Sequence, residues 1–161
     1  MLDPIDVQII NKLNNNGRVS LTELAEDINL SRVAIANRIE KLIQNDVMQV
    51  AASINLEKLH YNTLIVRLQI EKQNIDKVKK IIKTCPKVLF SLEMTGNHNL
   101  LLVCTDKNST GLRDFIEHVL KPCAEECKVS LASNPFTPRF VHLKTASCES
   151  CEYKEDCNNG V

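Results

Sequence analysis

Apolar residues recur at helical spacing in three short segments at the start of the chain. In the first segment, Ile5, Ile9 and Leu13 stand four residues apart, which places them on one face of a helix. Asp3 is suited to cap this helix, with Pro4 at its first position. The pattern predicts an amphipathic first helix with one buried face.

Two further helices are predicted directly after the first. The run SLTE, from Ser20 to Glu23, has the form of a capping box, in which the serine oxygen accepts a backbone N–H and the glutamate reaches back to the serine amide. Ser31 is suited to cap a third helix, with Leu30 and Ile35 placed as a hydrophobic staple. Two short helices joined by a tight turn, with another helix before them, indicate a helix-turn-helix.

The third predicted helix, LSRVAIANRIEKL at residues 30–42, has an apolar face and a polar face. Ile35, Ile39 and Leu42 are expected to face the first two helices. The opposite arc carries small and polar side chains that fit a major groove, where Asn can read adenine, Arg can contact guanine or phosphate, and a valine methyl can touch thymine. The residues predicted to contact DNA are Ser31, Arg32, Val33, Ala36, Asn37, Arg38 and Lys41. Two alternatives stay open, namely a solvated helix face and a tri-helical module that binds protein.

The second half of the chain alternates between strand-like and helical segments. Segments typical of strands are NTLIVRLQIE (62–71), KVLFSLEMTG (87–96), NLLLVCT (99–105), CKVSLASNP (127–135) and FTPRFVHL (136–143). Segments with apolar residues at helical spacing are NIDKVKKIIKTC (74–85) and STGLRDFIEHVLK (109–121). The order β-α-β-β-α-β predicts a ferredoxin-like domain, with both helices on one face of a four-stranded antiparallel sheet.

The fold expected from these patterns is α+β, with two domains, a connector and a tail. The expected parts are a winged helix-turn-helix at residues 1–50, a β connector at 51–61, the ferredoxin-like domain at 62–143 and a cysteine-rich tail at 144–161. The strands LIVRLQI (64–70) and LLLVC (100–104) are apolar at nearly every position, which implies that both faces of the sheet are covered. A second copy of the same sheet would supply that cover, so we predict a homodimer.

The charge of the chain changes what can be expected of DNA binding. Lys+Arg and Asp+Glu are equal at 20 each over 161 residues, and the first 60 residues are slightly acidic. Strong binding by a monomer is therefore not expected, whereas a dimer would combine two weak half-site contacts. The start of the chain has no basic leader and no stretch long enough to span a membrane, so we expect a cytoplasmic protein with no membrane partner.

Four sequence motifs together resemble the Lrp/AsnC ("feast/famine") family of transcription factors over about residues 1–143. These motifs are L-D-x-I-D from Leu2, G-R-V-S-x-x-E-L-A from Gly17, L-S-x-x-x-I-x-x-R-I-x-x-L from Leu30, and the T-G at Thr95. The resemblance implies a C-terminal effector domain, also called RAM, that forms dimers and often octamers. It also implies that the helix matching Ser31 to Leu42 binds promoter DNA.

The resemblance further implies a small effector, often an amino acid, bound at the turn after the T-G. The residues that match this turn are Thr95, Gly96, Asn97, His98 and Asn99. Family members commonly carry acids after the T-G that can hold an ammonium group, and here Asn97, His98 and Asn99 stand there instead. His98 can be read as a polar ligand contact or as an exposed turn residue.

The C-terminal tail, SCESCEYKEDCNNGV, is not explained by the resemblance. Cys148, Cys151 and Cys157 form a C-x2-C-x5-C array, a spacing that suits thiolate ligation of zinc or of an iron–sulfur cluster. A fourth ligand is expected from Cys123, Cys127, His142 or a partner subunit, whereas Cys85 and Cys104 lie in apolar runs typical of a core. A redox-active disulfide and an acidic tail with idle thiols are the alternatives.

The leading interpretation is a sequence-specific DNA-binding regulator and not an enzyme. The rival is a tetrapyrrole enzyme similar to siroheme decarboxylases, which share the two-domain architecture. The histidines are scattered, however, and Arg67, Arg113 and Arg139 are few for a substrate with many carboxylates. A protein-binding adaptor with a degenerate helix-turn-helix is the third possibility.

Overall fold

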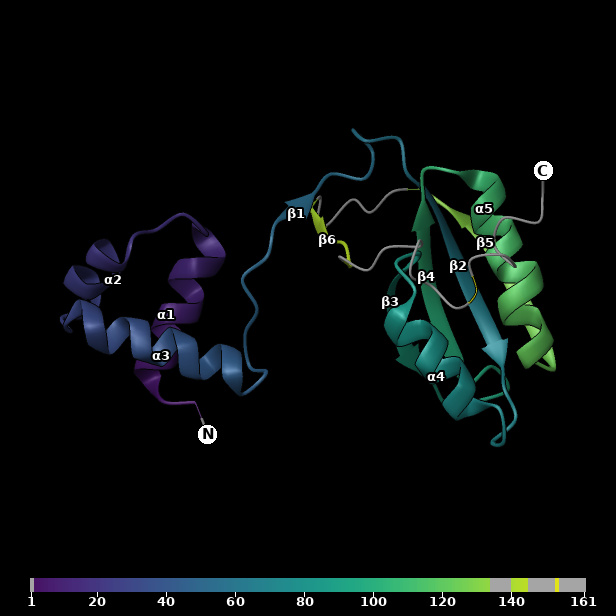
Figure 1. Cartoon of the computed structure of the whole chain (residues 1–161), viewed down its shortest axis with the longest axis horizontal. Helices are drawn as coiled ribbons and strands as arrows, with labels where there is room; N and C mark the ends of the chain where they lie inside the picture. The colour runs from purple at the N-terminus through teal and green to yellow at the C-terminus, as the bar shows by residue number, and fades with distance from the viewer. Residues whose placement is uncertain (1, 134–139, 145–152, 154–161) are drawn as a thin grey trace. The chain divides into compact units, whose positions relative to one another are not determined.

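The computed structural model describes residues 2–133, 140–144 and 153. The chain divides into two compact units between Ala52 and Ser53, inside the segment predicted as a connector (Figure 1). Among the described residues, no helix has the length and apolar character needed to cross a bilayer.

The first unit consists of the three predicted helices, α1 (Pro4–Asn15), α2 (Leu21–Ile28) and α3 (Arg32–Gln44). Its core is small and is formed by Ile9, Leu24, Ala25 and Ile35. Leu30 and Ile39 pack against this core while remaining partly exposed. The helix-turn-helix prediction is therefore confirmed, with the predicted faces turned inward.

Side-chain caps determine where each of these helices begins. The Asp3 carboxylate accepts a hydrogen bond from the Asp6 amide at 2.8 Å. Ser20 and Glu23 form the predicted capping box, with N···O distances of 3.1 and 2.8 Å. Ser31 accepts from the Ala34 amide at 3.2 Å and so starts α3. These bonds satisfy amide groups that have no partner inside the helix.

The second unit has the predicted β-α-β-β-α-β order. Its elements are β2 (Asn62–Gln69), α4 (Ile75–Thr84), β3 (Val88–Glu93), β4 (Leu100–Asp106), α5 (Ser109–Asp114), the π-helical turn η1 (Phe115–Leu120), the 3₁₀ turn η2 (Lys121–Cys123) and β5 (Glu126–Ala132). The sheet order is β3-β4-β2-β5, and all neighbours are antiparallel. Apolar residues of α4, α5 and η1 share one core with Val66, Leu68 and Leu102, which places the helices on the same face of the sheet. The ferredoxin-like fold is confirmed.

The predicted second helix of this unit is not regular along its length. After Asp114 it widens into the π-helical η1, and it then tightens into η2, which contains Pro122. The wider turn buries Phe115, Ile116, Val119 and Leu120. Apolar periodicity alone cannot distinguish these helix types, because all of them bury one stripe of side chains.

The predicted wing differs from the structure. Among described residues 2–52 there is no strand. The strand that follows, β1 (Ser53–Ile54), pairs with β6 (Val141–His142), a segment from the far end of the sequence. Both strands belong to the second unit. A wing is a hairpin formed by strands that are close in sequence, whereas β1 pairs with the distant β6.

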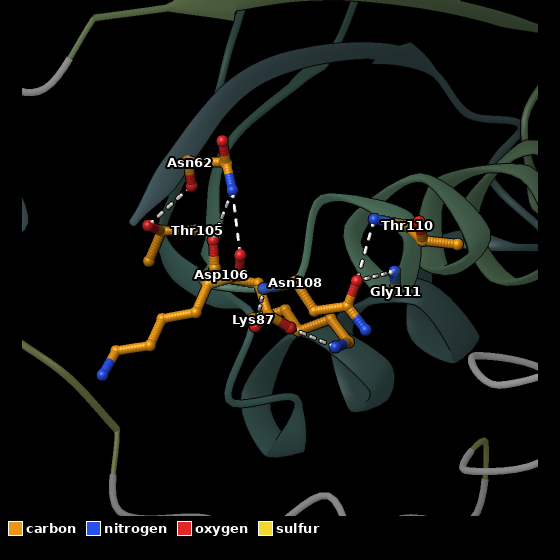
Figure 2. A network of polar contacts seen from close by, with 8 residues as sticks. Asn62, Lys87, Thr105, Asp106, Asn108, Thr110 and Gly111 are labelled. Carbon is orange, nitrogen blue, oxygen red and sulfur yellow. Dashed lines mark hydrogen bonds and ion pairs between the residues drawn. The ribbon is translucent and has the colours of Figure 1, made fainter. Parts of the chain in front are cut away.

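A polar network fixes the junction between β4 and α5 (Figure 2). The Asn108 side chain caps α5 by accepting from the amides of Thr110 and Gly111 at 3.0 and 3.2 Å. The Asn108 amide donates to the Asp106 carboxylate at 3.0 Å, and the same carboxylate pairs with the Lys87 ammonium group. Lys87 is only 8% exposed, so this pairing compensates for burial of its charge.

Candidate DNA-reading helix and effector turn

The outward face of α3 carries most of the residues predicted to contact DNA. Ser31, Arg32, Asn37 and Lys41 are exposed, and Val33 has 70% of its surface in solvent. Ala36 lies on the same arc and is half-buried. A small apolar group beside polar side chains is the surface that a major groove accepts. Contact of these residues with bases stays a prediction.

Arg38 has a role in the fold in addition to its predicted contact with DNA. Its guanidinium Nη1 lies 2.6 Å from the Asp3 carboxylate and 2.7 Å from the Asp6 carboxylate. The L-D-x-I-D motif therefore supplies both the cap of α1 and an anchor for α3. A base or phosphate contact by Arg38 remains a prediction, but it would have to compete with these two carboxylates.

The anchor makes the first unit sensitive to acid. The Asp6 amide hydrogen bond, followed by the Arg38 guanidinium, lowers the pKa of Asp3 below its ordinary value of 3.8. A carboxyl with a lowered folded-state pKa stabilises the fold above its unfolded pKa, and this stabilisation is lost as pH falls through the folded pKa. We therefore expect the melting temperature, followed by circular dichroism, to fall between about pH 5 and pH 2.

Asp3→Asn provides the control for this acid sensitivity. Asparagine caps helices about as well as aspartate but does not titrate. The variant should be less stable than the native chain at pH 7 and should lose less of its stability on acidification. Equal acid sensitivity in both proteins would rule out Asp3 as the group responsible.

The first unit, which we call the reading unit, carries little uncompensated positive charge. Residues 1–52 contain five basic and seven acidic side chains. Lys12 pairs with Asp27, and Arg38 pairs with the two aspartates. On α3, Arg32 and Lys41 have no ion-pair partner within the described part of the chain. The electrostatic attraction of one such unit for DNA is therefore weak.

The predicted effector turn joins β3 to β4. Gly96 has φ of 104°, a conformation that favours glycine, and Thr95 and Asn97 beside it are exposed. The Met94 amide donates to the Asn99 carbonyl at 2.9 Å, which closes the turn. The structure thus places these predicted residues together on one accessible loop.

His98 and Asn99 are less accessible than the rest of this turn. The Asn99 side chain donates from Nδ2 to the Ile70 carbonyl at 2.7 Å, and its Oδ1 accepts from the Ile70 backbone amide at 2.9 Å. It therefore ties the turn to the residue that follows β2. The His98 side chain is 16% exposed, and its Nε2 lies 3.4 Å from a Glu126 carboxylate oxygen. No described group forms a hydrogen bond with this nitrogen. Asn99 therefore serves the fold, and His98 Nε2 faces the Glu126 carboxylate without a hydrogen bond.

The second face of the sheet is apolar over β3 and β4 and is open in the single chain. Cross-strand register places Ile65, Phe90, Leu92, Leu101 and Val103 on the face opposite the helices. Phe90 is 47% exposed, and it lines a groove of about 640 Å³ together with Ile65, Val103 and Phe140. We call this surface the open sheet face. A large apolar patch of this kind marks a surface that another molecule covers.

The tail cysteines Cys148, Cys151 and Cys157 lie outside the described residues. Of the proposed fourth ligands, Cys123 is buried, with its thiol 3.5 Å from the Val119 carbonyl, whereas Cys127 is half-buried and His142 is exposed. In the ranges that the structure describes, no three His, Cys, Asp or Glu side chains are grouped to hold a metal.

Cys85 and Cys104 are core residues, as predicted. Both are buried in the core of the second unit. Burial raises the pKa of the Cys104 thiol to about 12. The Cys104 thiol is therefore protonated at neutral pH, and both cysteines contribute to packing of the core.

The two units match two parts of one known family. The AsnC-type helix-turn-helix domain model matches residues 2–43, and the Lrp/AsnC ligand binding domain model matches residues 63–139. An uncharacterised HTH-type transcriptional regulator of Pyrococcus abyssi is 30% identical over 122 residues, which are 74% of this chain and 83% of that protein.

Solved structures show the same architecture. LrpC of Bacillus subtilis superposes with a TM-score of 0.68 at 25% identity, over 85% of this chain and 99% of LrpC. A transcriptional regulator of Neisseria meningitidis, solved as a complex with L-Met, gives a TM-score of 0.70 at 21% identity, over 92% and 97% of the two chains. With its helix-turn-helix unit, its effector domain and these likenesses, the chain belongs to the Lrp/AsnC family of DNA-binding transcriptional regulators, which are not enzymes.

Proposed function

We propose that the protein regulates transcription as a homodimer, which is joined through the open sheet face and presents two α3 helices to double-stranded DNA. The observation that carries this proposal is the apolar character of that face, where Phe90 and Leu92 stand exposed in the single chain. Because one reading unit has a negative formal charge, two units at fixed spacing are needed for useful affinity.

The test is selection of bound sequences from a library of duplexes with 30 random base pairs. We expect enrichment of a two-fold symmetric sequence whose half-sites are about 10 base pairs apart or a multiple of this. Enrichment without symmetry would contradict the dimer. Failure to bind duplex DNA even at 50 mM salt would instead favour the protein-binding adaptor.

We also propose that a small effector binds at the Thr95–Asn99 turn and changes the assembly between dimer and octamer. The related regulator of Neisseria meningitidis was solved with L-Met, which makes amino acids the first ligands to try. The polar atoms that such an effector could contact are the exposed Asn97 side chain and His98 Nε2, which lies beside the Glu126 carboxylate without a hydrogen bond. Isothermal titration with L-methionine, the other amino acids and small carboxylates tests this, with Asn97→Ala as the site variant and size-exclusion chromatography reporting the assembly.

A metal in the tail is the remaining proposal, and its support is the C-x2-C-x5-C spacing of Cys148, Cys151 and Cys157. We expect protein purified without oxygen to contain about one zinc ion or an iron–sulfur cluster per chain. Elemental analysis and the visible spectrum distinguish the two. Cys148→Ser/Cys151→Ser should lose the metal, and native protein with neither zinc nor iron would leave only the thiol interpretations.

A further inference from the structure

The exposed side of α4 carries a row of lysines on the second unit. Lys77, Lys80 and Lys83 stand at positions i, i+3 and i+6 of this helix, and all three are exposed. They lie on the side away from the isoleucines and valine that α4 buries in the core. We call these three residues the α4 lysine stripe.

The charge of the α4 lysine stripe is not compensated by neighbouring acids. Among the described residues, none of its three lysines takes part in an ion pair, whereas the adjacent Lys79 is paired with Glu93. Asp76 is the one acidic residue within α4 itself. The stripe therefore presents a net positive surface to solvent.

The spacing of the lysines in α4 is not the one that best stabilises a helix. Like charges three or four residues apart destabilise a helix, and opposite charges stabilise it. The other helical segment of this unit follows the stabilising pattern, because Lys121 pairs with Glu117 one turn earlier. In α4 like charges stand three residues apart twice, from Lys77 to Lys80 and from Lys80 to Lys83, and Asp76 is the one opposite charge, four residues before Lys80.

The DNA-reading unit lacks the charge that the stripe supplies. Affinity for duplex DNA depends largely on how many phosphates the protein neutralises. The reading unit has more acidic than basic residues, and Arg38 and Lys12 are already paired. Within the reading unit, Arg32 and Lys41 on α3 are left without an ion-pair partner in the described residues, so cations of the second unit would add substantially to the phosphate contacts.

We propose that the α4 lysine stripe is a second DNA-contacting surface, which binds the sugar-phosphate backbone of duplex DNA without reading its sequence. This inference rests on the proposed DNA-binding dimer. The stripe contributes affinity and salt dependence, while α3 contributes base preference. Flexible ammonium groups suit this role, since each acts as a point charge that can follow a phosphate.

The experiment measures affinity for a 90-base-pair duplex that carries the selected operator, over 50 to 200 mM salt. The full-length variant Lys77→Gln/Lys80→Gln/Lys83→Gln removes the stripe. The matched control, Lys58→Gln/Lys107→Gln/Arg113→Gln, removes three positive charges from other exposed sites. Circular dichroism and size-exclusion chromatography establish that both variants fold and assemble like the native protein.

We expect the slope of log affinity against log salt to become shallower by about 2.7 for each protomer whose three lysines are engaged. Over this salt range the native protein would then lose about 40-fold more affinity per protomer than the stripe variant does. The control variant should keep the native slope, and the sequence preference of the stripe variant should be unchanged.

Two results overturn the inference while leaving the proposed function intact. The first is an unchanged slope in the stripe variant, even if the lysines then prove to bind anionic vesicles or an acidic protein. The second is an equal loss in both variants, since that would reflect net charge and not the stripe. Failure of the native protein to bind the duplex at 50 mM salt would instead refute the proposed function, and the inference with it.

Discussion

Phe90→Glu should convert the protein to a monomer and weaken its binding to a two-half-site operator by about a hundredfold or more. The side chain stands on β3 within the open sheet face, and a carboxylate there would be buried without a partner when two sheets meet. Each reading unit would then bind its half-site alone. Analytical ultracentrifugation gives the mass, and fluorescence anisotropy gives the affinity.

Leu131→Glu is the matched control for Phe90→Glu. Leu131 is also an exposed apolar residue of the same sheet, with 81% of its surface in solvent. Its register opposite Leu64, which packs against the core, places it on the helix face. The control should therefore remain dimeric. If Phe90→Glu also remained dimeric with native affinity, the open sheet face would not be the subunit contact.

Asn37→Ala should cost about 1–3 kcal/mol of operator binding for each half-site, because a bidentate contact between asparagine and adenine is worth this much. Asn37 is exposed on the outward arc of α3 and its side chain stabilises no other element through a hydrogen bond in the described structure. The loss should come with relaxed base preference at one position of each half-site. Repeating the duplex selection with the variant measures that preference.

Gln44→Ala is the corresponding control, since it removes another amide side chain near the far end of α3. The Gln44 amide reaches Glu40 at 3.1 Å, in an exposed contact of small energetic value. Its affinity and preference should stay native. Unchanged affinity and preference for Asn37→Ala as well would remove Asn37 from the set of base-reading residues.

The helix boundaries of the reading unit followed closely from the sequence because its signals are local. Ser20 and Glu23 lie three residues apart, so the capping box can be recognised without knowing the fold. The same holds for the ferredoxin-like order, where each strand and helix has its own periodicity. The Lrp/AsnC motifs then supplied the family, which the matches over both units confirm.

The features that the sequence did not predict depend on contacts between distant residues. Arg38 meets Asp3 across 35 positions, so the guanidinium was interpreted only as a DNA contact. β1 pairs with β6 across more than 80 residues, and the sequence of neither strand indicates which segment it pairs with. For Arg38, the two acids of the L-D-x-I-D motif could have indicated the contact, because two carboxylates close together at the start of α1 are stabilised by a nearby cation.

The buried ammonium group of Lys87 offers an internal reference for chemical labelling. Lys87 is shielded beside Asp106, whereas Lys77, Lys80 and Lys83 lie open to solvent a few residues earlier in the chain. An amine-reactive acylating reagent should therefore modify the three open lysines and the exposed Lys79, and should spare Lys87. Mass spectrometry of this short stretch would show bound nucleic acid as reduced acylation of Lys77, Lys80 and Lys83. Lys87, which stays unmodified in both states, serves as the internal reference.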